Sequence, residues 1–122
     1  MLDPKVQQAL EKDLVIDITT TGRKSGSSRR VEIWFHNLDG VLYVTGLPGT
    51  RGWYANILAD PRMTFHLKET AVADLPARAT PVTDTGEKRI VMERICAKQG
   101  TLDQLEARVS GAPLIKVDLE AD

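Results

Sequence analysis

Two short stretches of the chain hold the residues best suited to bind an anion. The first spans 22–30 and reads GRKSGSSRR, with four cationic side chains and no acid. The second spans 45–61 and reads TGLPGTRGWYANILADP, in which a glycine-rich loop precedes two aromatic residues. Glycines let backbone N–H groups approach an anion, and arginines fork onto carboxylate or phosphate oxygens. Together the stretches predict an anion-binding site.

The basic turn has several possible uses. A cluster of this kind is often only the solvated tip of a hairpin. Nucleic acid is disfavoured because the turn contains no aromatic residue and the net charge of the chain is −1. A phosphate or polycarboxylate ligand is the remaining interpretation, with Arg23 and Arg29 as its principal donors.

The glycine loop matches neither a Walker motif nor a dinucleotide-binding fingerprint, and an ordinary strand-to-helix turn is its alternative interpretation. Arg51 lies just before the expected helix, where the helix dipole is positive. Trp53 and Tyr54 offer aromatic rings at the same point. Asn56, one turn further on, could hydrogen-bond the polar edge of a heterocycle.

Other kinds of chemistry have little support. Cys96 is the only cysteine, and His36 and His66 alternate with apolar residues, which predicts two surface histidines and no metal site. No G-x-S-x-G elbow or carboxylate pair is present, so no catalytic side chain is assigned. Trp34 falls on the polar face of its expected strand and requires cover from a ligand or another subunit.

The elements that position these residues follow from periodicity and turn signals. With 122 residues, 42% of them hydrophobic and 27% charged, we expect one globular domain. No apolar run spans a bilayer and no signal peptide opens the chain, which predicts a cytoplasmic protein without a transmembrane segment. Strands are expected over 15–21, 31–36, 41–45, 63–68, 71–82 and 114–119, and helices over 3–12, 53–59, 84–98 and 101–111.

This order predicts a mainly β fold, a small antiparallel barrel with peripheral helices. The expected parts are an N-terminal helix over 1–13, a barrel core with the cofactor loops over 14–82, and C-terminal helices with a last strand over 83–122. Pro76 and Pro81 favour a bend or a sheet edge for their strand. Capping boxes are expected at Asp84 and Thr101, with Gly111 as the C′ residue that follows the last helix in the left-handed conformation.

The two motifs, TTTGRKSGxxR and WYxNILADPR, flank an apolar strand, an Asp-Gly hairpin and a glycine loop. In this order they resemble the deazaflavin-dependent nitroreductase family. The resemblance implies the flavin-type, FMN-binding-like split β-barrel and the cofactor coenzyme F420, an 8-hydroxy-5-deazaflavin.

The resemblance also implies the residues that contact the cofactor. Arg23, Lys24, Ser25 and Arg29 would face its phosphate and oligoglutamate tail. The ring would be enclosed by Ile33, Trp34, Thr45, Gly46, Gly52, Trp53, Tyr54 and Asn56. Gly49 and Arg51 belong to the loop that is shorter here than in the family, with Leu47-Pro48 in its middle and Arg51 standing in for a lost lysine.

The implied activity is hydride transfer to an electron-poor small molecule such as a quinone, an enone or a nitro compound. The alternatives are an FMN-dependent enzyme of the same fold, a non-catalytic F420-binding carrier, and an interaction module whose basic turn meets an acidic partner. A homodimer is compatible with an exposed Trp34. The C-terminal third lacks aromatic residues, so Met92, Leu102 and Leu105 are the candidates for a substrate wall, and their helical spacing favours ordinary core positions as the alternative.

Overall fold

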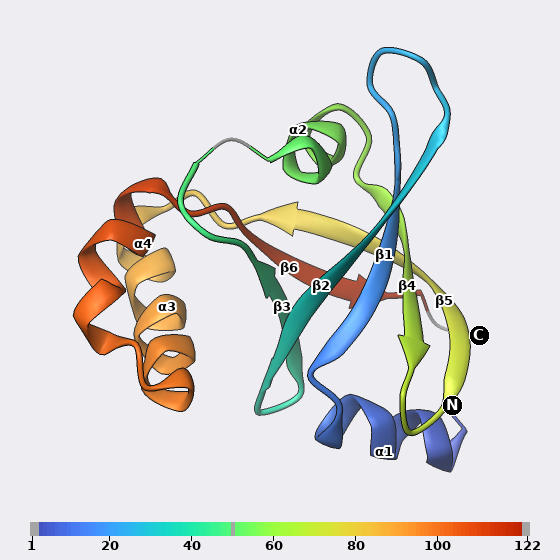
Figure 1. The fold of residues 1–122 in the computed structure, drawn as a ribbon, viewed down its shortest axis with the longest axis horizontal. Helices are drawn as coiled ribbons and strands as arrows, with labels where there is room; N and C mark the ends of the chain where they lie inside the picture. The colour runs from blue at the N-terminus through green and yellow to red at the C-terminus, as the bar shows by residue number, and fades with distance from the viewer. Residues whose placement is uncertain (1–2, 50, 121–122) are drawn as a thin grey trace.

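The computed structural model describes residues 3–49 and 51–120, which form a closed barrel of antiparallel strands in the order β1-β2-β3-β6-β5-β4 (Figure 1). The strands are β1 (Val15–Thr21), β2 (Ser28–Leu38), β3 (Val41–Thr45), β4 (Arg62–Lys68), β5 (Val72–Pro81) and β6 (Leu114–Leu119). The helices are α1 (Pro4–Lys12), α2 (Gly52–Ala59), α3 (Thr85–Gln99), the 3-10 turn η1 (Leu102–Gln104) and α4 (Leu105–Gly111). The mainly β architecture with peripheral helices is confirmed, and β6 closes the barrel together with the strands between 14 and 82.

The barrel interior is filled by the alternating apolar residues of its strands. Ile16 and Ile18 of β1 are fully buried, and the rings of Phe35 and Phe65 meet edge to face with centroids 5.2 Å apart. Helix α1 covers one end of the barrel with a buried apolar face (Figure 1). Asp3 caps that helix by accepting the Lys5 N–H at 2.8 Å, as its sequence predicts.

A second apolar cluster joins α3 and α4 to the outside of the barrel. Met92 and Ile95 of α3 pack with Leu38 of β2 and Leu114 of β6. Figure 1 shows the helix pair standing beside the barrel rather than over its end. Met92 is therefore core and cannot line a substrate wall, whereas Leu102 is 53% exposed in η1.

Both histidines are buried, and the prediction of surface histidines is wrong. His36 retains only 2% exposure because helices α3 and α4 pack over the outer side of its strand. His66 lies between Thr19, whose hydroxyl is 2.6 Å from its Nε2, and Asp74, whose carboxylate is 2.7 Å from its Nδ1. Periodicity within one strand does not reveal what later elements place over its polar face.

Three local predictions also require correction. Strand β5 pairs with both β4 and β6, so the sheet-edge alternative for its two prolines is wrong, and Pro76 lies where pairing with β6 ends. Thr101 makes no side-chain cap bond, whereas Asp84 does cap α3 through the Glu87 N–H at 2.9 Å. Gly111 is the last residue of α4 and does not adopt the left-handed conformation; Gly100 does so after α3, with φ 71°.

The β1–β2 hairpin projects beyond the barrel at the end where α2 lies (Figure 1). Strand β2 begins at Ser28, three residues earlier than expected, and continues the register through the pairs Thr21–Ser28 and Thr20–Arg29. The tip is closed by hydrogen bonds from Gly22 N to Ser27 O and from Gly26 N to Gly22 O. No helix of the described residues has both the length and the apolar character needed to cross a membrane.

Candidate cofactor site

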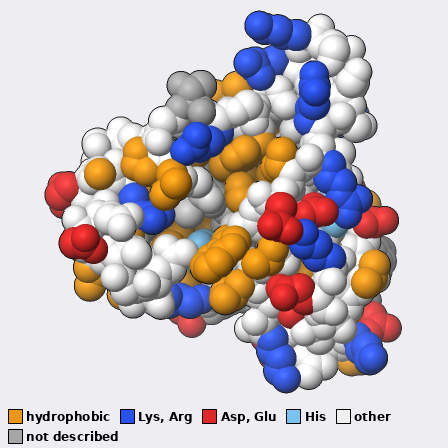
Figure 2. Space-filling view, in the orientation of Figure 1, with side chains coloured by type: hydrophobic (Ala, Val, Ile, Leu, Met, Phe, Trp, Pro, Cys, Tyr) orange, Lys and Arg blue, Asp and Glu red, His pale blue; other side chains and the backbone are white. Residues whose placement is uncertain are grey.

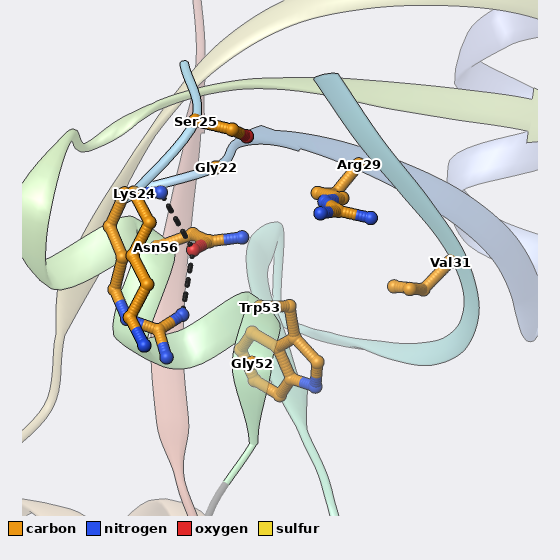
Figure 3. Close-up of a pocket in the computed structure, with 9 residues that line it drawn as sticks. Gly22, Lys24, Ser25, Arg29, Val31, Gly52, Trp53 and Asn56 are labelled. Atoms are coloured by element: carbon orange, nitrogen blue, oxygen red, sulfur yellow. Dashed lines mark hydrogen bonds between the residues drawn. The ribbon is translucent and has the colours of Figure 1, made fainter. Parts of the chain in front are cut away.

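A cavity of about 440 Å³ lies between the β1–β2 hairpin and the start of α2 (Figure 3). It brings together two segments that are some thirty residues apart in the chain. Its lining consists of Gly22, Arg23, Lys24, Ser25, Arg29, Val31, Gly52, Trp53 and Asn56. Seven of these are among the fourteen residues that the sequence nominates.

Strand alternation explains how Arg29 and Val31 reach this cavity. They lie on the same face of β2 as Ile33 and Phe35, which contact the barrel core. Because the hairpin extends past the barrel, the inward face of β2 continues beyond the core and there lines the cavity. Val31 therefore lies between the cationic turn and the apolar interior.

Asn56 ties the hairpin to α2. Its side-chain oxygen accepts the backbone N–H of Arg23 at 3.1 Å and a guanidinium N–H of Arg23 at 3.0 Å (Figure 3). Its side-chain amide donates to the Thr20 hydroxyl at 3.2 Å. The side-chain oxygen and one amide hydrogen of this buried residue are thus engaged within the protein, so Asn56 positions the basic turn.

The described lining of the cavity contains cations and no acid. Among the described residues, none of Arg23, Lys24 and Arg29 has a carboxylate within 4 Å. Arg30 belongs to the opposite face of the hairpin, where its Nε donates to Asp17 at 2.9 Å. Figure 2 shows Lys and Arg side chains gathered on the projecting hairpin. The basic turn therefore presents three cations to the cavity and a fourth to the barrel exterior.

Helix α2 adds a partial positive charge at the other wall. It begins at Gly52, and no side chain among the described residues caps its first turn. A Cβ on Gly52 would meet no atom within 4 Å, so the backbone there is open to the cavity. Uncapped N–H groups at a helix start favour an anionic neighbour. Trp53 follows directly and supplies a largely buried indole to the lining.

The remaining nominated residues lie outside this cavity. Ile33 packs against the barrel core, and Trp34 is 49% exposed on the outer side of β2. Thr45 is buried and donates to the carbonyl of Pro113 at 2.6 Å. Gly46 lies where a Cβ would come 3.5 Å from the Arg51 guanidinium and 3.6 Å from the Trp53 ring.

The other three nominated residues line a second cavity. Gly49, Arg51 and Tyr54 line a space toward α3 and α4 and not the one beside the hairpin. Successive residues of α2 thus face different cavities, because Trp53 and Tyr54 point to different sides of the helix.

Sequence reasoning did not include Val31 among the site residues, and it considered Gly22 only as part of the anion-binding turn. Val31 could have been found because it lies two residues from Arg29 on the same strand face. Gly22 has a steric signal that only the folded turn reveals: a Cβ there would lie 3.0 Å from both Ser25 Oγ and the Ser27 carbonyl. Among the described residues, no group of acidic, histidine or cysteine side chains is arranged to hold a metal ion.

Solved structures with the same fold bind several kinds of cofactor. The chain is similar to an FAD-binding protein from Mesorhizobium loti (15% identity, TM-score 0.71, covering 99% of this chain and 91% of that one). It is also similar to HutZ, the heme storage protein of Vibrio cholerae (15% identity, TM-score 0.75, 99% and 92% covered). Such similarity establishes the split β-barrel fold alone.

A structure described as an F420-H2 dependent reductase, FDR-A, is similar over 87% of this chain and 95% of that one, with 18% identity and a TM-score of 0.64. No curated protein matches the chain. The model of the F420H(2)-dependent quinone reductase family matches residues 2–118, nearly the whole sequence. The resemblance drawn from the two motifs is thereby confirmed: the chain belongs to the F420H(2)-dependent quinone reductase family, whose cofactor is F420.

Proposed function

We propose that this protein is an F420-dependent reductase that binds its cofactor in the cavity between the β1–β2 hairpin and α2, and that its acceptor is a quinone, an enone or a nitro compound. The observation that carries the proposal is the set of three cations facing one cavity without an acid among the described residues. Family membership supports the cofactor class.

The residues present fit this cofactor. Its phosphate and oligoglutamate tail are anionic, and Arg23, Lys24 and Arg29 are exposed cations that no described carboxylate neutralises. Each exposed pair contributes only about 0–1 kcal/mol, so the affinity for a flexible tail arises from several weak contacts. Val31 and Trp53 provide the apolar and aromatic wall that a planar ring requires.

The chemistry of the cofactor explains why the chain needs no catalytic triad. When bound, reduced F420 supplies a hydride to an electron-poor acceptor. In the part of the chain that the structure describes, the cavity lining contains no carboxylate, histidine or thiol. The side chains of this protein therefore bind and orient the reactants and exclude water from the ring, which are contributions from positioning rather than from acid–base catalysis.

Titration of the purified protein with F420 and with FMN tests the proposal. We expect F420 to bind and FMN to bind more weakly, because FMN has no oligoglutamate tail for Lys24 and Arg29. Oxidation of F420H2 by a quinone or a nitro compound then separates an enzyme from a carrier. Tight FMN binding without F420 binding would establish the FMN-dependent alternative, an inert F420 complex would establish a carrier, and binding of neither would leave the interaction module.

A further inference from the structure

The second cavity, of about 380 Å³, shares no lining residue with the proposed cofactor cavity. One wall comes from α2 through Tyr54, Ala55 and Leu58. The other comes from the connection between α4 and β6, over residues 110–113. Lys88 of α3 also belongs to the lining.

Close backbone contacts hold the frame of this cavity. The N–H of Gly49 donates to the carbonyl of Gly111 at 3.1 Å, which joins the glycine loop to the end of α4. A Cβ on Gly111 would lie 3.4 Å from the Cβ of Pro48, so the loop rests directly on the helix end. The cavity therefore exists without rearrangement of the chain.

The charges around the cavity are uncompensated. Its lining contains Arg51 and Lys88 and no acidic residue, and neither cation has a carboxylate within 4 Å among the described residues. Arg51 donates through Nη2 to the carbonyls of Leu47 at 3.1 Å and Pro48 at 3.4 Å, which orients its guanidinium and leaves further donors. Burial lowers the pKa of the Lys88 ammonium.

The rest of the lining is mainly apolar. Ala55, Leu58, Ala112 and Pro113 offer hydrocarbon surface, and Tyr54 offers an aromatic ring. Inorganic ions gain nothing from such surface, whereas an organic body removes it from water. The combination of two cations with an apolar wall thus selects for a ligand that has both an anionic end and an apolar end.

We infer that the cavity between α2, α3 and α4 is a second binding site, for a small organic anion such as an aromatic carboxylate. Its carboxylate is bound by Arg51 and Lys88, and its ring lies against Leu58 and Pro113. The inference does not rest on the proposed reductase activity: this cavity is separate from the one beside the hairpin, although Gly49, Arg51 and Tyr54 are residues that the family resemblance implies for the cofactor.

Benzoate titration of the 15N-labelled protein, followed by 1H–15N NMR, tests this inference. Glycine amides report on the two cavities separately: Gly49 and Gly111 line the second, and Gly22 and Gly52 line the first. We expect benzoate to shift Gly49 and Gly111, and the uncharged isostere benzamide to shift them far less. Phenyl phosphate serves as a second anionic probe.

Substitution of Lys88 completes the test. Lys88→Met removes the charge and keeps the hydrocarbon stem, and we expect benzoate to bind about tenfold more weakly, as for loss of a sheltered charge-assisted bond. Lys98→Met removes a charge from the exposed last turn of α3, outside the cavity, and should leave the affinity unchanged.

Three results would overturn the site. They are shifts confined to Gly22 and Gly52, equal responses to benzoate and benzamide, and the absence of any shift with both anionic probes. Equal weakening by Lys88→Met and Lys98→Met would show that benzoate senses only the general charge of the helix. Failure of F420 binding in a separate titration would bear on the proposed function and not on this site.

Discussion

Asn56 accepts both the backbone N–H and a guanidinium N–H of Arg23, a residue 33 positions earlier in the chain. This paired contact joins the tip of the β1–β2 hairpin to α2 and so brings together the two motifs of the sequence. Because the hairpin projects from the barrel, the contact determines where its cations lie relative to α2.

Loss of the Asn56 amide should therefore loosen the basic turn. We expect Asn56→Ala to lower the free energy of unfolding by about 1–3 kcal/mol, since it leaves buried polar groups without partners. It should also weaken F420 binding. Thr20→Val is the matched control, because it removes the hydroxyl that Asn56 contacts but leaves Arg23 bound. Urea unfolding and F420 titration of both variants measure the difference, and equal losses of F420 affinity would contradict the role assigned to the Arg23 contact.

Removal of positive charge from the basic turn should weaken the binding of the cofactor's anionic tail. We expect Lys24→Gln combined with Arg29→Gln to weaken F420 more than a tail-less deazaflavin, and added salt to have the same effect because exposed charges are screened over about 8–10 Å. Arg30→Gln removes a neighbouring charge that is paired with Asp17 outside the cavity, so it should leave F420 affinity unchanged. Comparable weakening by Arg30→Gln would indicate a general field rather than a tail site.

The two tryptophans allow the position of the ring to be measured. Trp53 lines the cavity, whereas Trp34 is half-exposed on the outer side of β2. We expect F420 to quench the fluorescence of the Trp34→Phe variant, in which Trp53 is the remaining tryptophan. If the quenching disappears in this variant, the ring lies against Trp34 and not against Trp53, although the family resemblance implies contact with both. Light scattering of the same variant tests whether a second copy of the chain covers Trp34.

His36 should make the fold sensitive to acid. Burial, with the nearby charges of Lys98 and Arg108, lowers its pKa from 6.5 to about 4. Between these values the unfolded chain binds a proton that the folded chain does not, so this contribution is present above pH 6.5 and is lost as the pH falls toward 4. The full shift corresponds to roughly 3 kcal/mol. Unfolding of wild type and His36→Gln at pH 7 and pH 4.5 should show a smaller acid loss in the variant; parallel losses would contradict the assignment.

The two expected helix caps should differ in their contribution to stability. Asp84→Ala should cost about 1 kcal/mol because the Asp84 carboxylate accepts the Glu87 N–H. Thr101→Ala should change the free energy of unfolding by less than about 0.5 kcal/mol, since the buried Thr101 hydroxyl has no partner among the described residues. Thermal unfolding of the two variants compares them directly, and similar costs would mean that Thr101 makes a contact that the fold does not show.

Local signals predicted much of the fold. Asp39 and Gly40 both adopt positive φ, 54° and 91°, as their hairpin motif requires. Asp3 and Asp84 cap their helices because a cap depends on neighbouring residues only. Local signals do not predict which distant elements pack together. For that reason the burial of His36 beneath α3 and α4 was not predicted.

In the candidate site, too, the sequence predicted the local features but not the features that depend on long-range packing. The cations of the turn and the indole of Trp53 were predicted together from two motifs and meet at one cavity. The sequence did not reveal that Arg30 faces away from its neighbours, although strand alternation through Arg29 contains that information once the start of β2 is known. The assignment of Tyr54 and Arg51 to a different cavity depends on how α2 is rotated between the hairpin and α4.

The tip of the projecting β1–β2 hairpin can change in sequence without a change in the barrel core. All six strands are paired on both sides within the closed barrel, and the tip from Gly22 to Ser27 contributes no residue to its core. Changes in the length or charge of the tip therefore leave the barrel packing untouched, provided that the contact between Arg23 and Asn56 is kept. One stable scaffold can in this way be fitted with tips of different charge, each suited to a cofactor with a different tail.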